Sequence, residues 1–306
     1  MLDEYVLVPD IFDPTAYSNA ALIDAYLPFL REPILQEALV RDLADGGWRK
    51  YCLDNAGSLH RLSRELIRKL VQGNRLRRFP RQAQQEPVST TDWCNEALGT
   101  NAVDALTGII VGHGTKQEFN QNEVASIERL TATPWWQGRS PTVSVDRKTL
   151  DYLRVLGRVL PQANSFMFID PYLDPSSQGY GQLHQLLTPL ASRDPKPKIE
   201  LHRSFNKGLP QHVTPDEPYW RRAFSDLGSQ LKACGLVAEV FIWSEFHDRF
   251  MIADVIGINA SAGFDVTNRP NDLAVWSRLG RSDKDAVQRR FDPASSPPRW
   301  RFLIGY

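Results

Sequence analysis

The spacing of apolar residues predicts strands and helices that alternate along the chain. An apolar strand at Tyr5–Val8 ends at Pro9-Asp10, and helical spacing follows over residues 19–43, where Pro28 and Pro33 indicate a division into two helices. Further elements in the first half are expected as helices at Ser58–Val71, Thr91–Leu98 and Asn122–Leu130 and as strands at Asn74–Phe79 and Thr107–Val111.

The second half continues the alternation. Helices are expected at Thr149–Val159, Gln182–Leu190 and Tyr219–Cys234, and strands at Ser165–Ile169, Lys198–His202, Ala238–Trp243, His247–Asp254 and Val255–Ile258. Alternating strands and helices predict the α/β class, with a mostly parallel sheet covered by helices.

Residues 131–149 predict a boundary between two domains. The segment holds two prolines, a glycine and several serines and threonines, which is typical of a loop or linker. Division at Arg139 gives a mixed α/β domain at residues 1–139 and a second domain at residues 140–306.

Composition narrows the class of protein. The 306 residues are 42% hydrophobic and 24% charged, as in globular domains, and no apolar run is long enough for a transmembrane helix. The start, MLDEYVLVPD, lacks the positive flank of a signal peptide. Cys52, Cys94 and Cys234 lie far apart, which favours free thiols in the cytoplasm and offers no zinc spacing, so we expect no metal and no cofactor.

A formal net charge of zero conceals a local excess of basic residues. Residues 61–81 hold eight basic residues against one acidic residue, and helical spacing puts Arg61, Arg64 and Arg68 on one face. Together with Arg75, Arg77 and Arg78, these side chains are candidates for binding DNA or RNA, or an anionic membrane. The alternative is internal ion pairing with acids elsewhere in the chain.

Acidic residues of the first half suggest a second kind of site. Asp10 and Asp13 follow the first strand, and three further acids come later in this half, namely Asp92, Glu96 and Asp104. Acids at strand ends and on a later helix resemble the way in which PIN-like nucleases gather a metal cluster. Ordinary surface acids and helix caps are the alternative, since His113 follows the strand TGIIV where such a nuclease has an acid.

The most specific motif is His247-x-Arg249 followed by Asp254. Alternation along a strand would place His247 and Arg249 on one face, where an imidazole can attack phosphorus and a guanidinium can hold two phosphate oxygens. The alternative is a structural histidine paired with Glu245 or Asp248.

This spacing resembles the His-x-Lys-x-x-x-x-Asp motif of the phospholipase D superfamily, with arginine in place of lysine. The resemblance covers residues 150–306 and implies a phospholipase D-like α/β sandwich with a metal-free phosphohistidine mechanism. It implies that His247 acts as nucleophile or acid, Arg249 as phosphate clamp and Asp254 as supporting acid. The chain has one copy of the motif, because nothing follows His202 to make a second, so the mechanism would pair two His247 residues in a homodimer.

Other parts of the second half fit the same resemblance. An Asp-Pro-Tyr turn beside the site is found in this superfamily, so Asp170 and Tyr172 are expected to bind substrate together with Glu245 and Ser261, although Asp170 could instead cap a turn. The usual Gly-Ser-x-Asn segment is absent, and a Gly-Phe-Asp turn occupies residues 263–265. This variant is similar to the non-catalytic, phosphoinositide-binding domain of eukaryotic MIT-domain proteins and to bacterial relatives linked to phage defence.

Two functional hypotheses follow. The first is a homodimeric phosphodiesterase, specifically a nuclease with a defence or toxin role. The second is a non-catalytic module that binds a phosphate of nucleic acid, nucleotide or lipid headgroup, as a subunit of a larger complex.

Overall fold

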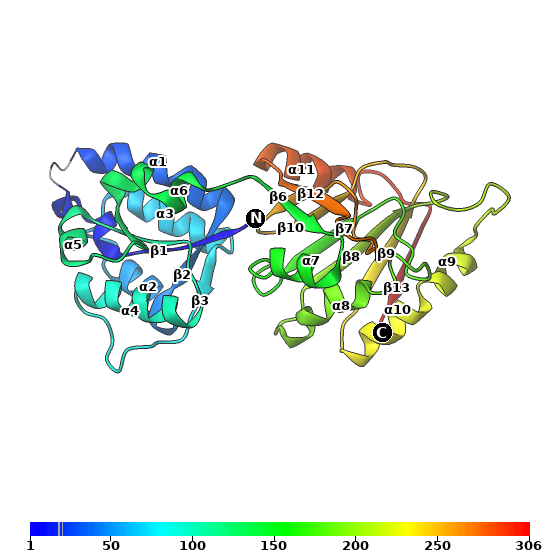
Figure 1. Ribbon diagram of the computed structural model, residues 1–306, viewed down its shortest axis with the longest axis horizontal. Coiled ribbons are helices and arrows are strands. Elements are labelled where there is room, and N and C mark those ends of the chain that lie inside the picture. Colours follow the sequence, from blue (N-terminus) through cyan, green and yellow to red (C-terminus); the bar gives the residue numbers. More distant parts are fainter. Residues whose placement is uncertain (18, 20) are drawn as a thin grey trace. The chain divides into compact units, whose positions relative to one another are not determined.

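The computed structural model describes residues 1–17, 19 and 21–306 and divides them into two compact units (Figure 1). The N-terminal unit comprises Leu2–Ser140 and the C-terminal unit comprises Pro141–Tyr306. Each unit is built from a sheet and helices, which confirms the mixed α/β class. No helix in the described part of the chain combines the length and the apolar character needed to cross a membrane.

A five-stranded parallel sheet with the order β3-β2-β1-β4-β5 forms the centre of the N-terminal unit. Its strands are β1 (Asp3–Leu7), β2 (Ala38–Asp42), β3 (Leu76–Arg78), β4 (Gly108–Val111) and β5 (Val124–Ser126). The connecting helices are α1 (Leu22–Glu37), α2 (Leu43–Asp54), α3 (Arg61–Gln72), α4 (Thr90–Val103), α5 (His113–Glu118) and α6 (Pro134–Gln137). The strand order reverses between β1 and β4, which pair at Val6 and Ile109.

Three predictions for this unit are wrong. Pro28 and Pro33 both lie inside one continuous helix, α1, because each proline replaces only one backbone donor and the packing of Leu27, Leu30 and Ile34 holds the helix together. Residues 38–42 form the strand β2 instead of ending a helix. Residues 122–130, expected as a helix, contain β5 and the start of a 3-10 helix at Ile127–Ala132.

The C-terminal unit contains an eight-stranded mixed sheet with the order β13-β9-β8-β7-β10-β11-β12-β6. Only β7 (Ser165–Ile169), β8 (Lys198–Ser204) and β9 (Ala238–Trp243) run parallel to one another. The remaining strands pair antiparallel and are β6 (Thr142–Asp146), β10 (Phe250–Ala253), β11 (Gly257–Ala260), β12 (Leu273–Arg278) and β13 (Trp300–Ile304).

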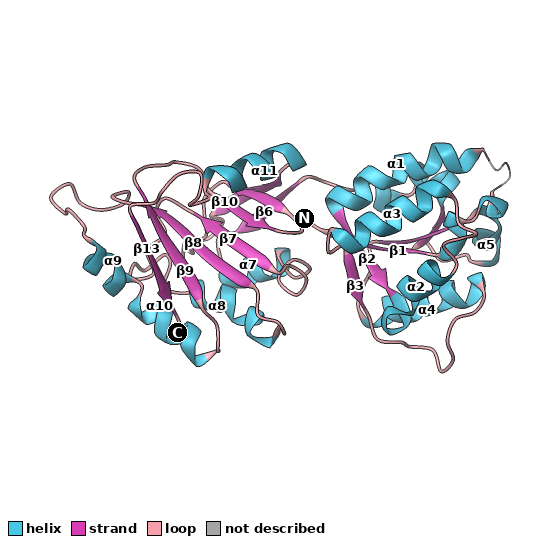
Figure 2. Ribbon diagram, turned by 180° about the vertical axis from the view of Figure 1, so that it is seen from behind, coloured by secondary structure: helices cyan, strands magenta, loops and turns pink. Residues whose placement is uncertain are grey.

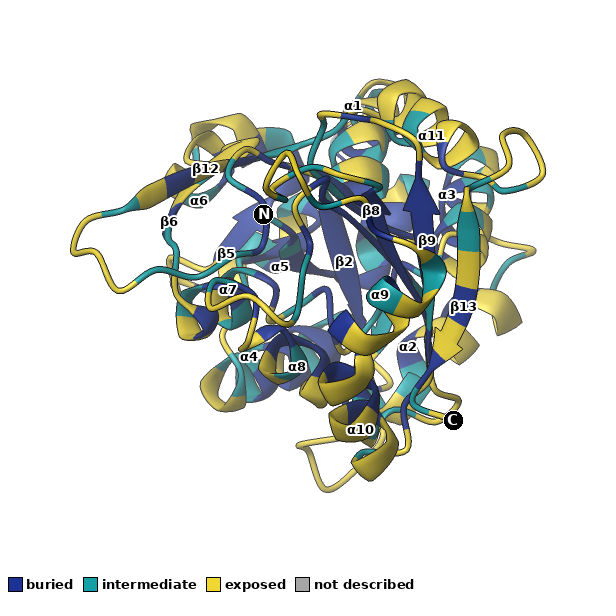
Figure 3. Ribbon diagram, turned by 90° about the vertical axis from the view of Figure 1, so that its right-hand side faces the viewer, coloured by how far each residue is buried: buried dark blue, intermediate teal, exposed yellow. Residues whose placement is uncertain are grey.

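Helices cover both faces of this sheet (Figure 2). One side carries α7 (Thr149–Val155), α8 (Leu183–Leu187), α9 (Glu217–Ala223) and α10 (Ser225–Ala233), and the other carries α11 (Arg281–Arg290). The residues expected as one helix at Tyr219–Cys234 are thus two helices that meet at Phe224. The central strands are buried while β13, at one edge, alternates between exposed and buried residues (Figure 3).

Candidate functional site

The site lies at the carboxyl edge of β7, β8 and β9, where three parallel strands end together. Asp170 follows β7, Lys207 lies in the loop after β8, and Glu245 lies in the segment after β9. Ligands of α/β proteins bind at this edge because the loops that follow neighbouring parallel strands converge there. The topology therefore brings residues together that are about 80 positions apart in sequence.

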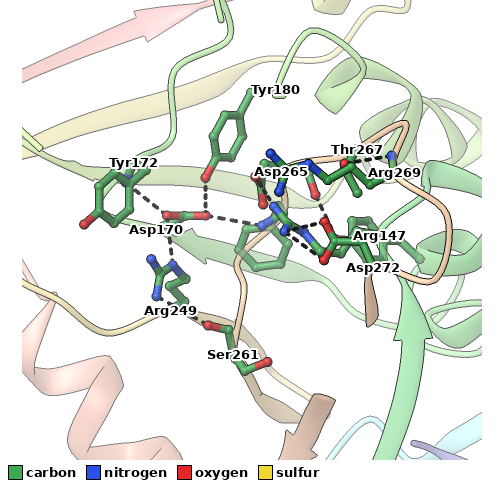
Figure 4. Close-up of polar contacts among 12 residues, drawn as sticks. Arg147, Asp170, Tyr172, Tyr180, Arg249, Ser261, Asp265, Thr267, Arg269 and Asp272 are labelled. Carbon is green, nitrogen blue, oxygen red and sulfur yellow. Dashed lines mark hydrogen bonds and ion pairs between the residues drawn. The ribbon is translucent and has the colours of Figure 1, made fainter. Parts of the chain in front are cut away.

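Asp170 is a fully buried carboxylate with fixed hydrogen-bond donors. Its Oδ2 accepts hydrogen bonds from the Tyr180 hydroxyl (2.7 Å) and the Phe264 amide (3.2 Å), and its Oδ1 accepts one from the Tyr172 amide (3.0 Å) (Figure 4). Burial raises the pKa of Asp170, against the opposing effect of the Tyr180 hydrogen bond. The side chain is thus held in one orientation.

Gly263 allows the backbone to pack closely against the Asp170 carboxylate. A Cβ atom at position 263 would lie 2.0 Å from Asp170 Oδ2 and 3.1 Å from Arg249 Cδ. The residue also has a φ of +81°, which glycine adopts without strain. The Gly-Phe-Asp turn seen in the sequence is therefore the segment that closes over the carboxylate.

Arg249 lies in front of Asp170. Its Nε is 3.7 Å from Asp170 Oδ1, its guanidinium carbon is 5.0 Å from the centre of the Tyr172 ring, and its Nη1 donates to the Ser261 carbonyl (3.3 Å). The ion pair and the cation–π contact orient a side chain that remains 28% exposed. Arg249 can therefore donate hydrogen bonds to a ligand.

A second arginine, Arg147, lies on the same pocket. It forms ion pairs with Asp265 and, at 3.1 Å, with Asp272, while the Tyr152 hydroxyl donates to the Asp265 carbonyl at 2.9 Å. Burial raises the pKa of Asp265 in spite of the neighbouring Arg147. Sequence reasoning missed Arg147 because it lies in the segment interpreted as a linker.

The pocket between these side chains has a volume of about 390 Å³ and is open to solvent. We call it the site pocket. Two guanidinium groups, two phenol rings and one carboxylate line it, and its lining residues are Arg147, Tyr172, Tyr180, Arg249, Ser261, Ala262 and Asp265 (Figure 4). Arginines outnumber carboxylates in this lining, and their planar donors match the oxygens of a phosphate group.

His247 does not lie on a strand. Residues 245–249 are irregular and β10 begins at Phe250, so the strand alternation expected for His247 and Arg249 is wrong. The backbone follows another course because Phe246 is buried against Phe291, with ring centres 5.0 Å apart. The His247 imidazole is 72% exposed, with Nε2 3.5 Å from Glu245 Oε1.

Glu245 connects His247 to the loop after β8. Its Oε1 also lies 2.8 Å from Lys207 Nζ, and this contact lowers the pKa of Glu245. Asp248, which follows His247, pairs with Arg290 at 2.6 Å. Glu245 thus lies beside a lysine and a histidine and does not line the site pocket.

Asp254 lies outside the site, which contradicts its expected role as supporting acid. Its carboxylate accepts hydrogen bonds from the amides of Asn164 (3.0 Å) and Val255 (3.1 Å) in the turn after β10. Because β10 runs antiparallel to β7, its start lies at the carboxyl edge and its end at the opposite edge. Asp254 therefore stabilises a turn one strand length away from Arg249.

The other predicted ligands of this unit do reach the pocket. Tyr172 lines the pocket, and the residue as a whole is 39% exposed. Ser261 contributes its carbonyl, whereas its hydroxyl accepts a hydrogen bond from the Val275 amide at 3.1 Å. Tyr180 lies in a loop with no motif that marks it in sequence, whereas Asp265 belongs to the Gly-Phe-Asp turn but was not expected to line a pocket.

The six arginines expected to bind nucleic acid do not form one surface. Arg75 is buried and donates to the Ala38 carbonyl (3.1 Å), Arg77 pairs with Glu4 (2.7 Å), and Arg78 pairs with Asp45 (2.8 Å). Contacts within the chain thus occupy these three, and for Arg77 and Arg78 the partner is an acid, as the alternative interpretation predicted. The other three share the exposed face of α3, namely Arg61, Arg64 and Arg68.

The N-terminal acids do not gather into a metal site. Asp10 accepts from the Gly112 amide and the Thr115 hydroxyl. The others cap turns and helix ends or pair with arginine, namely Asp13, Asp92, Glu96 and Asp104. Among the described residues no three acidic, histidine or cysteine side chains are placed to hold a metal ion.

Comparisons with known proteins give little further guidance. No protein-family model matches the chain. No curated protein matches it either. Among solved structures, the archaeal chromatin protein TrmBL2, whose structure shows a novel mode of DNA binding, aligns with 76% of this chain and 79% of its own at 11% identity and a TM-score of 0.29. A similarity at this level does not define a shared fold.

Proposed function

We propose that the site pocket binds a phosphate group of a phosphodiester, and that the physiological ligand is nucleic acid. The observation that carries this proposal is the pair of guanidinium groups, from Arg147 and Arg249, on one open pocket of about 390 Å³. Arginine binds phosphate oxygens through parallel N–H donors, which makes it the residue of choice for such a site.

Preorganisation supports the proposal. Arg249 contacts Asp170, the Tyr172 ring and the Ser261 carbonyl before any ligand is present, so little side-chain freedom is lost on binding. Asp170 is fully buried and does not line the pocket, so it orients Arg249 from behind. A phosphate would complete the hydrogen bonding of a guanidinium already in place.

The aromatic lining favours nucleic acid over a lipid headgroup. Tyr172 is 39% exposed beside Arg249 and offers a face on which a base can stack. The resemblance to the phospholipase D superfamily also favours a phosphodiester over a phosphomonoester. A single-stranded oligonucleotide combines both features, because its bases are free to stack.

Cleavage of the bound diester is a second candidate function, and the exposure of His247 favours it. With 72% of its side chain exposed, the imidazole is accessible to a second copy of the chain. In a homodimer His247 would attack phosphorus while the partner subunit's His247 protonates the departing alkoxide. Water would then hydrolyse the phosphohistidine and restore both imidazoles.

Binding is tested by fluorescence anisotropy with labelled 12-nucleotide DNA and RNA single strands. Arg249→Ala should weaken binding at least tenfold, because a charge-assisted, bidentate contact is lost. The matched control is Arg301→Ala, which removes an exposed arginine that pairs with Glu239 near the start of β9. Equal effects of the two substitutions, or no binding by the unaltered protein, would contradict the proposal.

Cleavage is tested separately, with the same oligonucleotides in EDTA. His247→Ala should abolish cutting and leave binding intact, because Arg249 and Arg147 remain. Sedimentation should show a dimer under the conditions of cutting. A strictly monomeric protein that still cuts would overturn the paired-histidine mechanism, and cutting that requires metal would exclude the phosphohistidine mechanism.

A further inference from the structure

A separate feature lies in the N-terminal unit, on the surface between α2 and α3. The two helices enclose a groove of about 290 Å³, which we call the α2–α3 groove. Its floor is formed by Cys52 and Ile67, both almost fully buried, and its rim by Leu53 and Val71. Nothing in the proposed phosphate site uses this surface.

The rim exposes apolar side chains that the fold leaves uncovered. Leu53 is 55% exposed and Val71 is 42% exposed, although both lie next to buried residues of the same helices. Single exposed leucines are common, but two large apolar side chains on either side of a groove form a contiguous patch. Such a patch gains free energy when another apolar surface covers it.

Basic side chains run along the same groove. Arg64 and Arg68 line it one helical turn apart, and Arg61 extends the row along the exposed face of α3. None of the three has an aspartate or glutamate within 4.0 Å in the described part of the chain, in contrast to Arg77 and Arg78. The row therefore offers three guanidinium groups that form no close ion pair within the described residues, although Glu65 lies near enough to Arg68 to interact with its charge.

We propose that the α2–α3 groove docks an acidic amphipathic helix of a partner protein. One or two apolar side chains of that helix would fill the groove, in contact with Leu53, Ile67 and Val71. Aspartates or glutamates one turn apart on the same helix would face Arg64 and Arg68. A helix laid in a groove is a recurrent mode of recognition, with apolar anchors for affinity and charges for specificity.

The combination of features distinguishes this partner from nucleic acid. A sugar–phosphate backbone would pair with the arginines but has no apolar group to place between Leu53 and Val71. The groove volume suits one or two apolar side chains better than a long acyl chain. A helix that carries acids beside apolar residues satisfies both the charged and the apolar parts of the groove.

Selection from a random 16-residue peptide display library tests the proposal on the full chain. The library is counter-selected on Val71→Asp, a substitution at an exposed position that should leave folding unchanged. Enriched peptides should combine leucine, isoleucine, phenylalanine or methionine at helical spacing with aspartate or glutamate. A synthetic peptide of that consensus should bind at least tenfold more weakly to Arg64→Glu, and Arg129→Glu serves as the charge-matched control because Arg129 is exposed and lies outside the groove.

Three results would overturn the proposal. The first is no enrichment above the counter-selected variant. The second is enrichment of peptides without acidic residues. The third is binding of single-stranded oligonucleotide that Arg64→Glu abolishes and Val71→Asp leaves unchanged, which would assign the arginine row to nucleic acid instead.

Discussion

The two units use the carboxyl edges of their sheets in different ways. In each, an aspartate follows a central parallel strand and a glycine faces its carboxylate. A Cβ on Gly112 would lie 2.6 Å from Asp10 Oδ2, and one on Gly263 would lie 2.0 Å from Asp170 Oδ2. The shared device is a carboxylate that accepts hydrogen bonds from a closely packed loop.

The two sites differ in whether a cationic side chain lies beside the carboxylate. Among the described residues no lysine or arginine forms an ion pair with Asp10, whose Oδ2 is taken by the Gly112 amide and the Thr115 hydroxyl. Asp170 instead orients Arg249 on an open pocket. In both units the aspartate at the strand end accepts hydrogen bonds that stabilise the fold. Of the two, only Asp170 also supports a binding site, because it holds a cation that faces a cavity.

Substitution of Gly263 should have the largest effect. Gly263→Ala should lower the free energy of unfolding of the C-terminal unit by about 3–5 kcal/mol, because the new methyl group displaces Asp170 from its donors and the backbone is strained as well. Oligonucleotide binding should be lost. Urea denaturation followed by tryptophan fluorescence measures the change.

Gly235→Ala is the control for this prediction. Gly235 has a similar φ, +65°, but no atom lies within 4 Å of its added Cβ. Gly235→Ala should lower the free energy of unfolding through backbone strain only, by about 1 kcal/mol. Equal losses for the two substitutions would show that close packing on Asp170 has no particular importance.

Gly112→Ala applies the same test to the other edge. Its φ of −69° is ordinary, so the cost comes from the close approach of the new methyl group to Asp10 and, at 3.2 Å, to the Ala16 Cβ, and we expect about 2 kcal/mol of destabilisation. Oligonucleotide affinity should stay within twofold of the unaltered protein. A marked loss of binding would indicate that the N-terminal edge also takes part in recognition, and would remove the contrast between the two edges.

A comparison of two arginine substitutions separates an internal arginine from an exposed one. Arg77→Ala should destabilise the N-terminal unit by about 2 kcal/mol, because the carboxylate of Glu4 is fully buried and would lose its ion pair with Arg77 at 2.7 Å. Arg61→Ala, on the exposed face of α3, should change stability by less than about 0.5 kcal/mol. Urea denaturation measures both changes. If Arg61→Ala destabilised the unit more than Arg77→Ala, Arg77 would belong with the exposed arginines, as the sequence alone suggested.

The pattern of residues predicts strands more reliably where they are apolar. β1, β4, β7, β8 and β9 were expected close to where they lie, and all except β8 contain a short apolar run that ends near a turn. β2 was missed because Arg41 and Asp42 interrupt its apolar pattern, and Arg41 is buried by pairing with Glu4. Such a pair is invisible until the two strands are placed side by side.

The candidate site was predicted in part for the same reason. Asp170, Tyr172 and Arg249 belong to local motifs, and the structure brings them together. Arg147 was missed because it lies in the segment interpreted as a linker and because its partners lie about 120 residues away in the sequence. Asp254 was wrongly included because motif spacing does not reveal that β10 carries it to the opposite edge of the sheet.

Asp10→Asn should have the smallest effect of these predictions. The effect appears in how the free energy of unfolding depends on pH. Burial raises the pKa of Asp10 to about 6 from its ordinary value of 3.8. The folded state therefore binds a proton more tightly than the unfolded state, so the stabilisation is present at low pH and is lost as the pH rises through about 6. Between pH 5 and pH 7.5 the loss from this group amounts to about 1 kcal/mol.

Asparagine cannot titrate and its carbonyl can still accept from Gly112 and Thr115, so Asp10→Asn should lack this component. Urea denaturation at the two pH values should give a smaller decline in the free energy of unfolding for Asp10→Asn than for the unaltered protein. Asp54→Asn, at an exposed position on α2, should match the unaltered protein. Because the unaltered protein and Asp10→Asn differ in no other titrating group, parallel declines would mean that Asp10 does not change its protonation state between the two pH values.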